Sequence, residues 1–167
     1  MKQWKKHIPG FACCFAVACF LSLTGTAPAQ VRKTVIGRIE RVSIPAFGLS
    51  LEGRIDTGAR KCSLHAFHEK EVRSGGESFI EFSTTDDQGK ILRMKSRIVE
   101  RIMIRTTGGE SSHLYVIREK VTLGSVTRDV HINLNNRSGL KYKFLVGRNL
   151  LRGTFVVDVS QSHVLAD

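Results

Sequence analysis

One short segment carries the residue types best suited to acid–base chemistry. The string Asp56-Thr57-Gly58-Ala59 follows residues 49–55, whose alternating apolar pattern predicts a strand that ends at the aspartate. Gly58 permits a tight turn and the close approach of a second chain, Thr57 supplies a short hydroxyl, and Ala59 adds little bulk. A carboxylate held at the end of a strand can give or take a proton. The same string also suits an ordinary strand-ending turn, so the rest of the sequence must show whether the aspartate is functional.

A second informative segment lies near the end of the chain. Residues 144–151 read Phe-Leu-Val-Gly-Arg-Asn-Leu-Leu, and the first three predict a buried strand. From Arg148 onward the sequence allows one or two helical turns, and residues 155–157 return to a strand pattern. The chain therefore combines an acidic loop with a later apolar strand, a turn at Gly147 and a short helix.

Together these two segments resemble the retropepsin-like aspartic proteases. In that family the apolar strand passes behind the catalytic loop, and the Gly-Arg turn leads into the helix that supports it. The resemblance implies an all-β fold, a closed or nearly closed barrel with one short C-terminal helix. It implies Asp56, Thr57 and Gly58 as the catalytic residues. It also implies supporting roles around the loop for Ala59, Ser63, His65, Gly147 and Arg148.

The sequence is similar in particular to a bacterial branch of that family. This branch is named for ATP-dependent zinc proteases and is often associated with the ligase that adds glutamates to a ribosomal protein. The similarity covers most of residues 34–165. It rests on residues 56–60 continued by 63–66, on 136–142, on 147–148 and on 155–158. These stretches are specific to the family in combination, whereas a single short string such as Asp-Thr-Gly would not be.

The resemblance implies that water is activated by two carboxylates that share one proton. The ionised carboxylate takes a proton from the water, and the protonated one hydrogen-bonds the scissile carbonyl. Only one Asp-Thr-Gly string occurs, and Asp158 lacks the following glycine that such a turn needs. We therefore expect a homodimer in which Asp56 meets its symmetry mate. This mechanism requires no metal, cofactor or covalent intermediate.

The words zinc and ATP in the name of that branch find little support in the residues. The sequence contains neither a Gly-rich phosphate loop followed by Lys-Ser/Thr nor a His-Glu-x-x-His string. The tightest set of possible ligands is Cys62, His65 and His68. On a strand, the first two point to opposite faces, and the first and last lie about 20 Å apart. A helical turn would shorten that spacing, so a zinc site stays an alternative, with His113 and His131 expected at the surface.

The rest of the chain predicts an all-β domain. Short β-type runs alternate with turn signals, and no long amphipathic helix is evident. Beyond residues 49–55 and 144–157, the predicted strands are residues 34–42, 63–67, 78–83, 91–104, 113–123 and 126–134. Gly108 and Gly109 suit the tip of a mobile hairpin flap, and the turn at 86–89 is a rival candidate for the flap. The single cysteine after residue 29, Cys62, is expected to be buried.

The first 29 residues have the layout of a cleaved signal peptide. Three lysines, Lys2, Lys5 and Lys6, precede an apolar run over 11–23, and small residues follow at 27–29. The run is shorter than the roughly 20 residues that span a bilayer. We therefore expect a bacterial protein that is exported to the periplasm or secreted, with residues 30–167 forming one protease domain and no stable membrane span after cleavage. An uncleaved N-terminal anchor stays the alternative.

The charge balance restricts the partners. The net charge of +11 falls to +8 once the three lysines of the leader are removed. The basic residues are dispersed and accompany no nucleic-acid recognition motif, so nucleic acid is not an expected partner. The leading hypothesis is an exported aspartic-type endopeptidase that acts on a peptide or protein substrate, and the positive charge favours acidic ones. The alternatives are a catalytically silent barrel that binds acidic peptides or envelope components, and a zinc-dependent peptidase.

Overall fold

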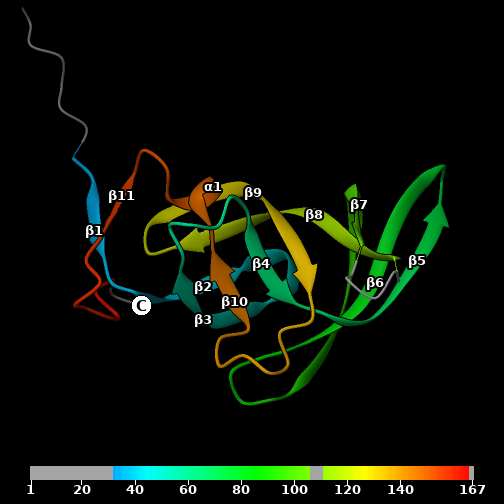
Figure 1. Ribbon diagram of the computed structural model, residues 1–167, viewed down its shortest axis with the longest axis horizontal. Coiled ribbons are helices and arrows are strands. Elements are labelled where there is room, and N and C mark those ends of the chain that lie inside the picture. Colours follow the sequence, from blue (N-terminus) through cyan, green and yellow to red (C-terminus); the bar gives the residue numbers. More distant parts are fainter. Residues whose placement is uncertain (1–31, 106–110, 166–167) are drawn as a thin grey trace, which may run out of the picture. The chain divides into compact units, whose positions relative to one another are not determined.

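Six strands close into a barrel in the computed structural model, which describes residues 32–105 and 111–165 (Figure 1). Around the barrel the strands follow the order β2 (Ile39–Ile44), β3 (Leu49–Ile55), β10 (Phe144–Val146), β4 (Cys62–His65), β9 (Val126–Asn135) and β8 (Ser111–Leu123). Closure comes from antiparallel pairing of β2 with β8, where Val42 faces Leu123 and Ser43 faces Thr122. A closed sheet leaves these strands no free edge. The predicted all-β barrel is confirmed.

Three further strands extend the sheet outward from β8. They are β7 (Ile91–Arg105), β6 (Glu77–Thr85) and β5 (Phe67–Ser74), joined by antiparallel ladders. The sequence analysis placed no strand at residues 68–74. Six of the eight residues of β5 are polar or charged, so the apolar alternation that reveals a half-buried strand is absent. Pairing with β6 stabilises this strand, in place of the burial of an apolar face.

The run predicted as one strand over residues 34–42 is two strands, which corrects the sequence analysis. β1 (Thr34–Ile36) leaves the barrel and pairs in parallel with β11 (Phe155–Val157), and β2 starts at Ile39. The break falls at Gly37, where an added Cβ would lie 2.7 Å from the carbonyl carbon of Gln161. Only glycine lets the two backbones approach so closely.

The interior of the barrel is apolar. Alternate residues of β3 point inward, so that Leu49 and Leu51 are fully covered. Phe144 and Val146 of β10 lie in the same core, between β3 and β4. Burial of one such side chain contributes about 2 kcal/mol to folding. The short helix is confirmed as α1 (Arg148–Leu151), and its buried Leu150 and Leu151 close one end of the core. A 3-10 turn, η1 (Pro45–Phe47), joins β2 to β3.

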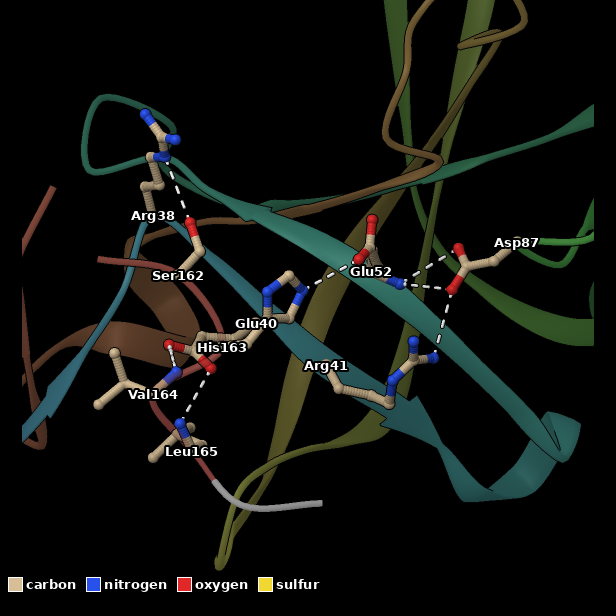
Figure 2. Close-up of polar contacts among 9 residues, drawn as sticks. All are labelled: Arg38, Glu40, Arg41, Glu52, Asp87, Ser162, His163, Val164 and Leu165. Carbon is tan, nitrogen blue, oxygen red and sulfur yellow. Dashed lines mark hydrogen bonds and ion pairs between the residues drawn. The ribbon is translucent and has the colours of Figure 1, made fainter. Parts of the chain in front are cut away.

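A buried carboxylate holds the C-terminal segment against β2. Glu40 is fully buried, and its Oε1 accepts hydrogen bonds from the backbone N–H groups of Gly37 and Val164. Oε2 accepts a third bond from Leu165, at 3.2 Å (Figure 2). A buried carboxylate is tolerated when backbone donors satisfy it in this way. Glu40 thereby fixes the last described residues to the barrel.

The predicted signal peptide lies outside the described residues, as do Gly108 and Gly109 of the flap candidate. Among the described residues, no helix is long and apolar enough to cross a membrane.

Removal of the Glu40 carboxylate is expected to destabilise the barrel. Glu40→Ala would leave the buried Gly37 N–H and the part-buried N–H groups of Val164 and Leu165 without their acceptor. We expect a loss of about 3 kcal/mol in the free energy of unfolding, measured by urea denaturation. The control is Glu52→Gln, because Glu52 contacts the half-exposed His163 at 2.9 Å and an exposed pair contributes about 1 kcal/mol or less. Equal stability of Glu40→Ala and wild type would contradict this role.

Candidate active site

Asp56 lies at the end of β3, where its backbone N–H donates to Val146 of β10 at 2.9 Å. Its Oδ1 accepts hydrogen bonds from the N–H groups of Gly58 at 2.8 Å and Ala59 at 3.1 Å. These two bonds turn the chain tightly after Asp56 and fix the orientation of the carboxylate. Within the described ranges, no side chain forms a hydrogen bond or an ion pair with Asp56. The second oxygen, Oδ2, is therefore available to a ligand.

Arg148 contacts the loop after Asp56 through its side chain and its backbone. Its Nη1 donates to the carbonyl oxygens of Thr57 at 3.1 Å and Gly58 at 2.7 Å. Its backbone N–H donates to the carbonyl of Ala59 at 2.9 Å. The carbonyl groups of the loop thus face one guanidinium, while the N–H groups face the Asp56 carboxylate. Two N–H groups and three carbonyl groups of the loop are thus paired, which gives the turn a defined shape.

Gly147 allows the strand before α1 to pass directly against the segment that follows the loop. A Cβ at this position would lie 2.4 Å from the carbonyl carbon and oxygen of Lys61. Asn149 continues this contact, because its Oδ1 accepts from the Cys62 N–H at 3.0 Å and its Nδ2 donates to the His131 carbonyl at 2.8 Å. The sequence analysis gave no role to Asn149. An amide side chain beside two apolar residues, Leu150 and Leu151, is the sequence feature that could have indicated its position.

Cys62 and the nearby histidines do not form a metal site. Burial raises the pKa of the Cys62 thiol to about 11, so it stays protonated near neutral pH and is a poor ligand or nucleophile. His65 uses Nδ1 to accept the Arg137 N–H at 3.0 Å. Across residues 32–105 and 111–165, no three His, Cys, Asp or Glu side chains cluster closely enough to bind a metal ion. This set of side chains therefore does not fit a zinc ion. His113 and His131 are exposed, as expected.

His65 anchors a different segment from the one assigned to it in the sequence analysis. Its hydrogen bonds join it to the Arg137 N–H and to the Lys143 carbonyl, and its ring stacks on Phe67 with centroids 5.3 Å apart. No hydrogen bond links His65 to the loop at 56–59. Burial, together with the charge of Lys143, lowers the pKa of His65, so the ring is neutral at pH 7.

Arg137 is a site residue that sequence reasoning missed. Its side chain is buried, with Nε donating to the Tyr142 carbonyl at 3.3 Å. Burial lowers the pKa of Arg137, while the negative charge of Asp56 acts in the opposite direction. The guanidinium is therefore within electrostatic range of Asp56 without forming an ion pair. A buried arginine is rare, and nothing in a polar string such as 136–142 distinguishes it from exposed ones.

The remaining predicted residues have clear positions. Ser63 is buried on β4, and its Oγ has no hydrogen-bond partner among the described residues. Asp158 accepts hydrogen bonds from the hydroxyl and N–H of Ser160 and from the Gln161 side chain, which lower the pKa of its carboxyl. The rival flap turn is fixed to the barrel, because Asp87 accepts the Glu52 N–H and pairs with Arg41 (Figure 2).

The β7–β8 hairpin carries the other flap candidate. Its strands stay paired as far as Arg105 and Ser111, on either side of Gly108 and Gly109. The two glycines themselves lie outside the described residues. At the barrel end of the hairpin, Lys61 pairs with Glu100 of β7, which connects the segment after the Asp56 loop with the hairpin.

Comparison with known proteins agrees with this geometry. The profile of the RimB-like family, described as retropepsin-like aspartic endopeptidase RimB, matches residues 35–166. The chain belongs to the RimB-like family. This assignment confirms the resemblance to retropepsin-like proteases that the two separated segments indicated.

Curated relatives of this RimB-like chain carry a different name. It is 34% identical over 142 residues to a probable alpha-L-glutamate ligase of Parasynechococcus marenigrum and 34% identical over 139 residues to one of Shewanella pealeana. These matches cover 83% and 81% of this chain but only 30% of each relative. The RimB-like chain thus spans less than a third of the length of these relatives.

Solved structures show the same fold. A protein of unknown function (DUF785) from Legionella pneumophila superimposes with a TM-score of 0.68 at 24% identity. The superposition covers 80% of the RimB-like chain and 98% of the Legionella chain. At this level of identity the similarity establishes the fold alone.

We predict that Gly147→Ala distorts the site. The new methyl group would meet backbone atoms of Lys61 that cannot turn aside, so we expect a loss of at least about 2 kcal/mol in the free energy of unfolding. Gly139→Ala is the matched control, since an added Cβ there meets nothing within 4 Å, and it should change stability by less than about 0.5 kcal/mol. Chemical denaturation of both variants tests the prediction, and equal losses would refute it.

The neutral state of His65 predicts a pH-dependent stability. The folded pKa lies below its ordinary value of 6.5, so the contribution of the Arg137–His65 bond is complete above pH 6.5 and is lost as the pH falls through the folded pKa. His65→Asn offers an oxygen near the Nδ1 position and does not titrate. Urea unfolding between pH 7.5 and 5 should therefore show a smaller decrease for this variant than for wild type. A parallel decrease would exclude His65 as the titrating group.

Proposed function

We propose that this chain is an aspartic-type endopeptidase whose active site forms from two copies of Asp56. The observation that supports it is the geometry of that side chain, with Oδ1 held by two backbone N–H groups and Oδ2 without a partner among the described residues. The family profile, described as an aspartic endopeptidase, supports the same reaction.

The proposed reaction needs a second carboxylate close to the first. Two copies related by a twofold axis supply it, because such an interface brings each residue 56 against its own counterpart. Two carboxylates so close cannot both ionise readily, and the pair therefore holds one proton. The ionised member removes a proton from a water molecule between them. The protonated member hydrogen-bonds the carbonyl oxygen and stabilises the tetrahedral intermediate.

The small residues of the loop allow the Asp56 loops of two copies to approach each other. Gly58 and Ala59 present almost no side-chain bulk beside Asp56, so a second loop can come close. Arg148 and the two backbone bonds to Oδ1 keep the carboxylate in one orientation. A fixed orientation lowers the cost of placing the water between two acids. Arg137 adds positive charge near the site, which offsets the repulsion between two acidic groups.

An acidic peptide is the substrate that the charges favour. Arg54 near the end of β3 is exposed, and buried Arg137 lies within electrostatic range of Arg54 and Asp56. Clefts of one sign of charge concentrate ligands of the opposite sign. The names of the curated relatives, which refer to glutamate ligation, make a glutamate-rich peptide the first candidate. Export to the periplasm or cell surface remains part of this proposal.

Asp56→Asn is expected to abolish peptide cleavage, because an amide cannot take a proton from water. The decrease should exceed about a hundredfold in a peptide-library assay followed by mass spectrometry. Asp129→Asn is the matched control, since Asp129 is an exposed residue of β9 that pairs with Arg118 at 3.9 Å. That variant should retain full activity.

Mixing experiments test the shared site. An excess of Asp56→Asn protein should reduce the activity of the wild type, because mixed dimers carry one working carboxylate. Specific activity should also rise with protein concentration, in parallel with the dimer fraction measured by analytical ultracentrifugation. Cleavage that survives in Asp56→Asn, or full activity in a species that stays monomeric, would overturn the proposal.

A further inference from the structure

A cavity of about 670 Å³ lies beside the catalytic loop, on the side of α1. Five residues line it: Arg60, Arg128, Arg148, Asn149 and Arg152. Four of these are arginines, and they come from the segment after the loop, from β9 and from the region of α1. Among the residues that the structure describes, no acidic one contributes to the lining. Four like charges around one cavity cost electrostatic energy in the empty protein, which an anion would relieve.

Two of the arginines are fixed in position by protein oxygens. Arg128 donates through Nη1 to the carbonyls of Leu150 at 3.1 Å and Arg152 at 2.8 Å, and through Nη2 to the hydroxyl of Thr154. Arg148 uses Nη1 alone for its two bonds to the loop carbonyls. A guanidinium has five N–H donors, so about two remain on Arg128 and about three on Arg148. Those donors are already oriented and lack acceptors among the described residues.

The other two arginines are not neutralised. Arg60 and Arg152 are exposed, and neither side chain forms a hydrogen bond or ion pair within residues 32–105 and 111–165. Other basic side chains do find partners, for example Arg101 with Glu71 and Lys61 with Glu100. The cavity therefore combines two fixed guanidinium groups with two that can move towards a ligand.

We propose that this cavity binds an anion with more than one phosphate group, either free pyrophosphate or the diphosphate of a small molecule. Planar guanidinium groups match phosphate oxygens in pairs, and several arginines require several negative charges to balance them. A single carboxylate carries too little charge for four arginines. The cavity volume lies within the range of small-molecule sites. The site is separate from Asp56, which does not line it, but it shares Arg148 with the catalytic loop.

Isothermal titration of the full chain with pyrophosphate, at constant ionic strength, tests the proposal. Wild type should bind, and Arg60→Gln/Arg152→Gln should bind at least about tenfold more weakly, because the variant loses two charged hydrogen-bond donors. Arg73→Gln/Lys90→Gln removes the same charge from exposed positions on β5 and before β7 and should bind like wild type. Asp56→Asn should also bind normally, so this result does not depend on the protease proposal.

Further ligands separate the sources of the anion and the competing explanation. Adenosine diphosphate beside pyrophosphate shows whether the diphosphate is recognised free or on a carrier, and binding of either supports the site. If the double glutamine variant is less stable, Arg60→Lys/Arg152→Lys keeps the charge and should show intermediate affinity. Failure of wild type to bind either phosphate ligand overturns the proposal. A larger loss for a hexaglutamate peptide than for pyrophosphate also overturns it and assigns the arginines to a peptide site.

Discussion

The arrangement of this protein depends on how one turn satisfies its own backbone. Asp56 accepts the N–H groups that follow it, and Arg148 takes the carbonyl groups of the same turn. Neither half is sufficient, because an unpaired set of carbonyls or N–H groups would let the loop relax away from the strand end. The barrel supplies these partners from two distant parts of the sequence. A working geometry at the loop therefore requires the whole sheet to close.

The position of β10 explains why distant segments act together. This three-residue strand lies between β3 and β4, parallel to the first and antiparallel to the second. Val146 accepts the backbone N–H of Asp56, and the next residue, Gly147, packs against Lys61. α1 then begins directly behind the loop. The short helix is thus placed by a strand ladder, and its own few residues need not stabilise it.

Much of the fold and part of the site could be read from the sequence. The strand before Asp56, the glycine at 147 and the helix at Arg148 follow from local patterns that depend on sterics and hydrophobic period. β5 could not be read, because a polar strand is formed by its partner and leaves no periodic signal. Arg137 and Asn149 were also hidden, since their roles depend on which distant backbone groups they meet. The register that brings them there is a property of the closed barrel.

The Glu40 contact has a consequence for synthesis of the chain. Its acceptor oxygens are matched by N–H groups of Val164 and Leu165, close to the C-terminal end, while Glu40 itself stands early in the described region. During translation this acid emerges long before two of its three donors exist, and until then it must stay in water. The barrel therefore completes its interior only after Val164 and Leu165 have left the ribosome.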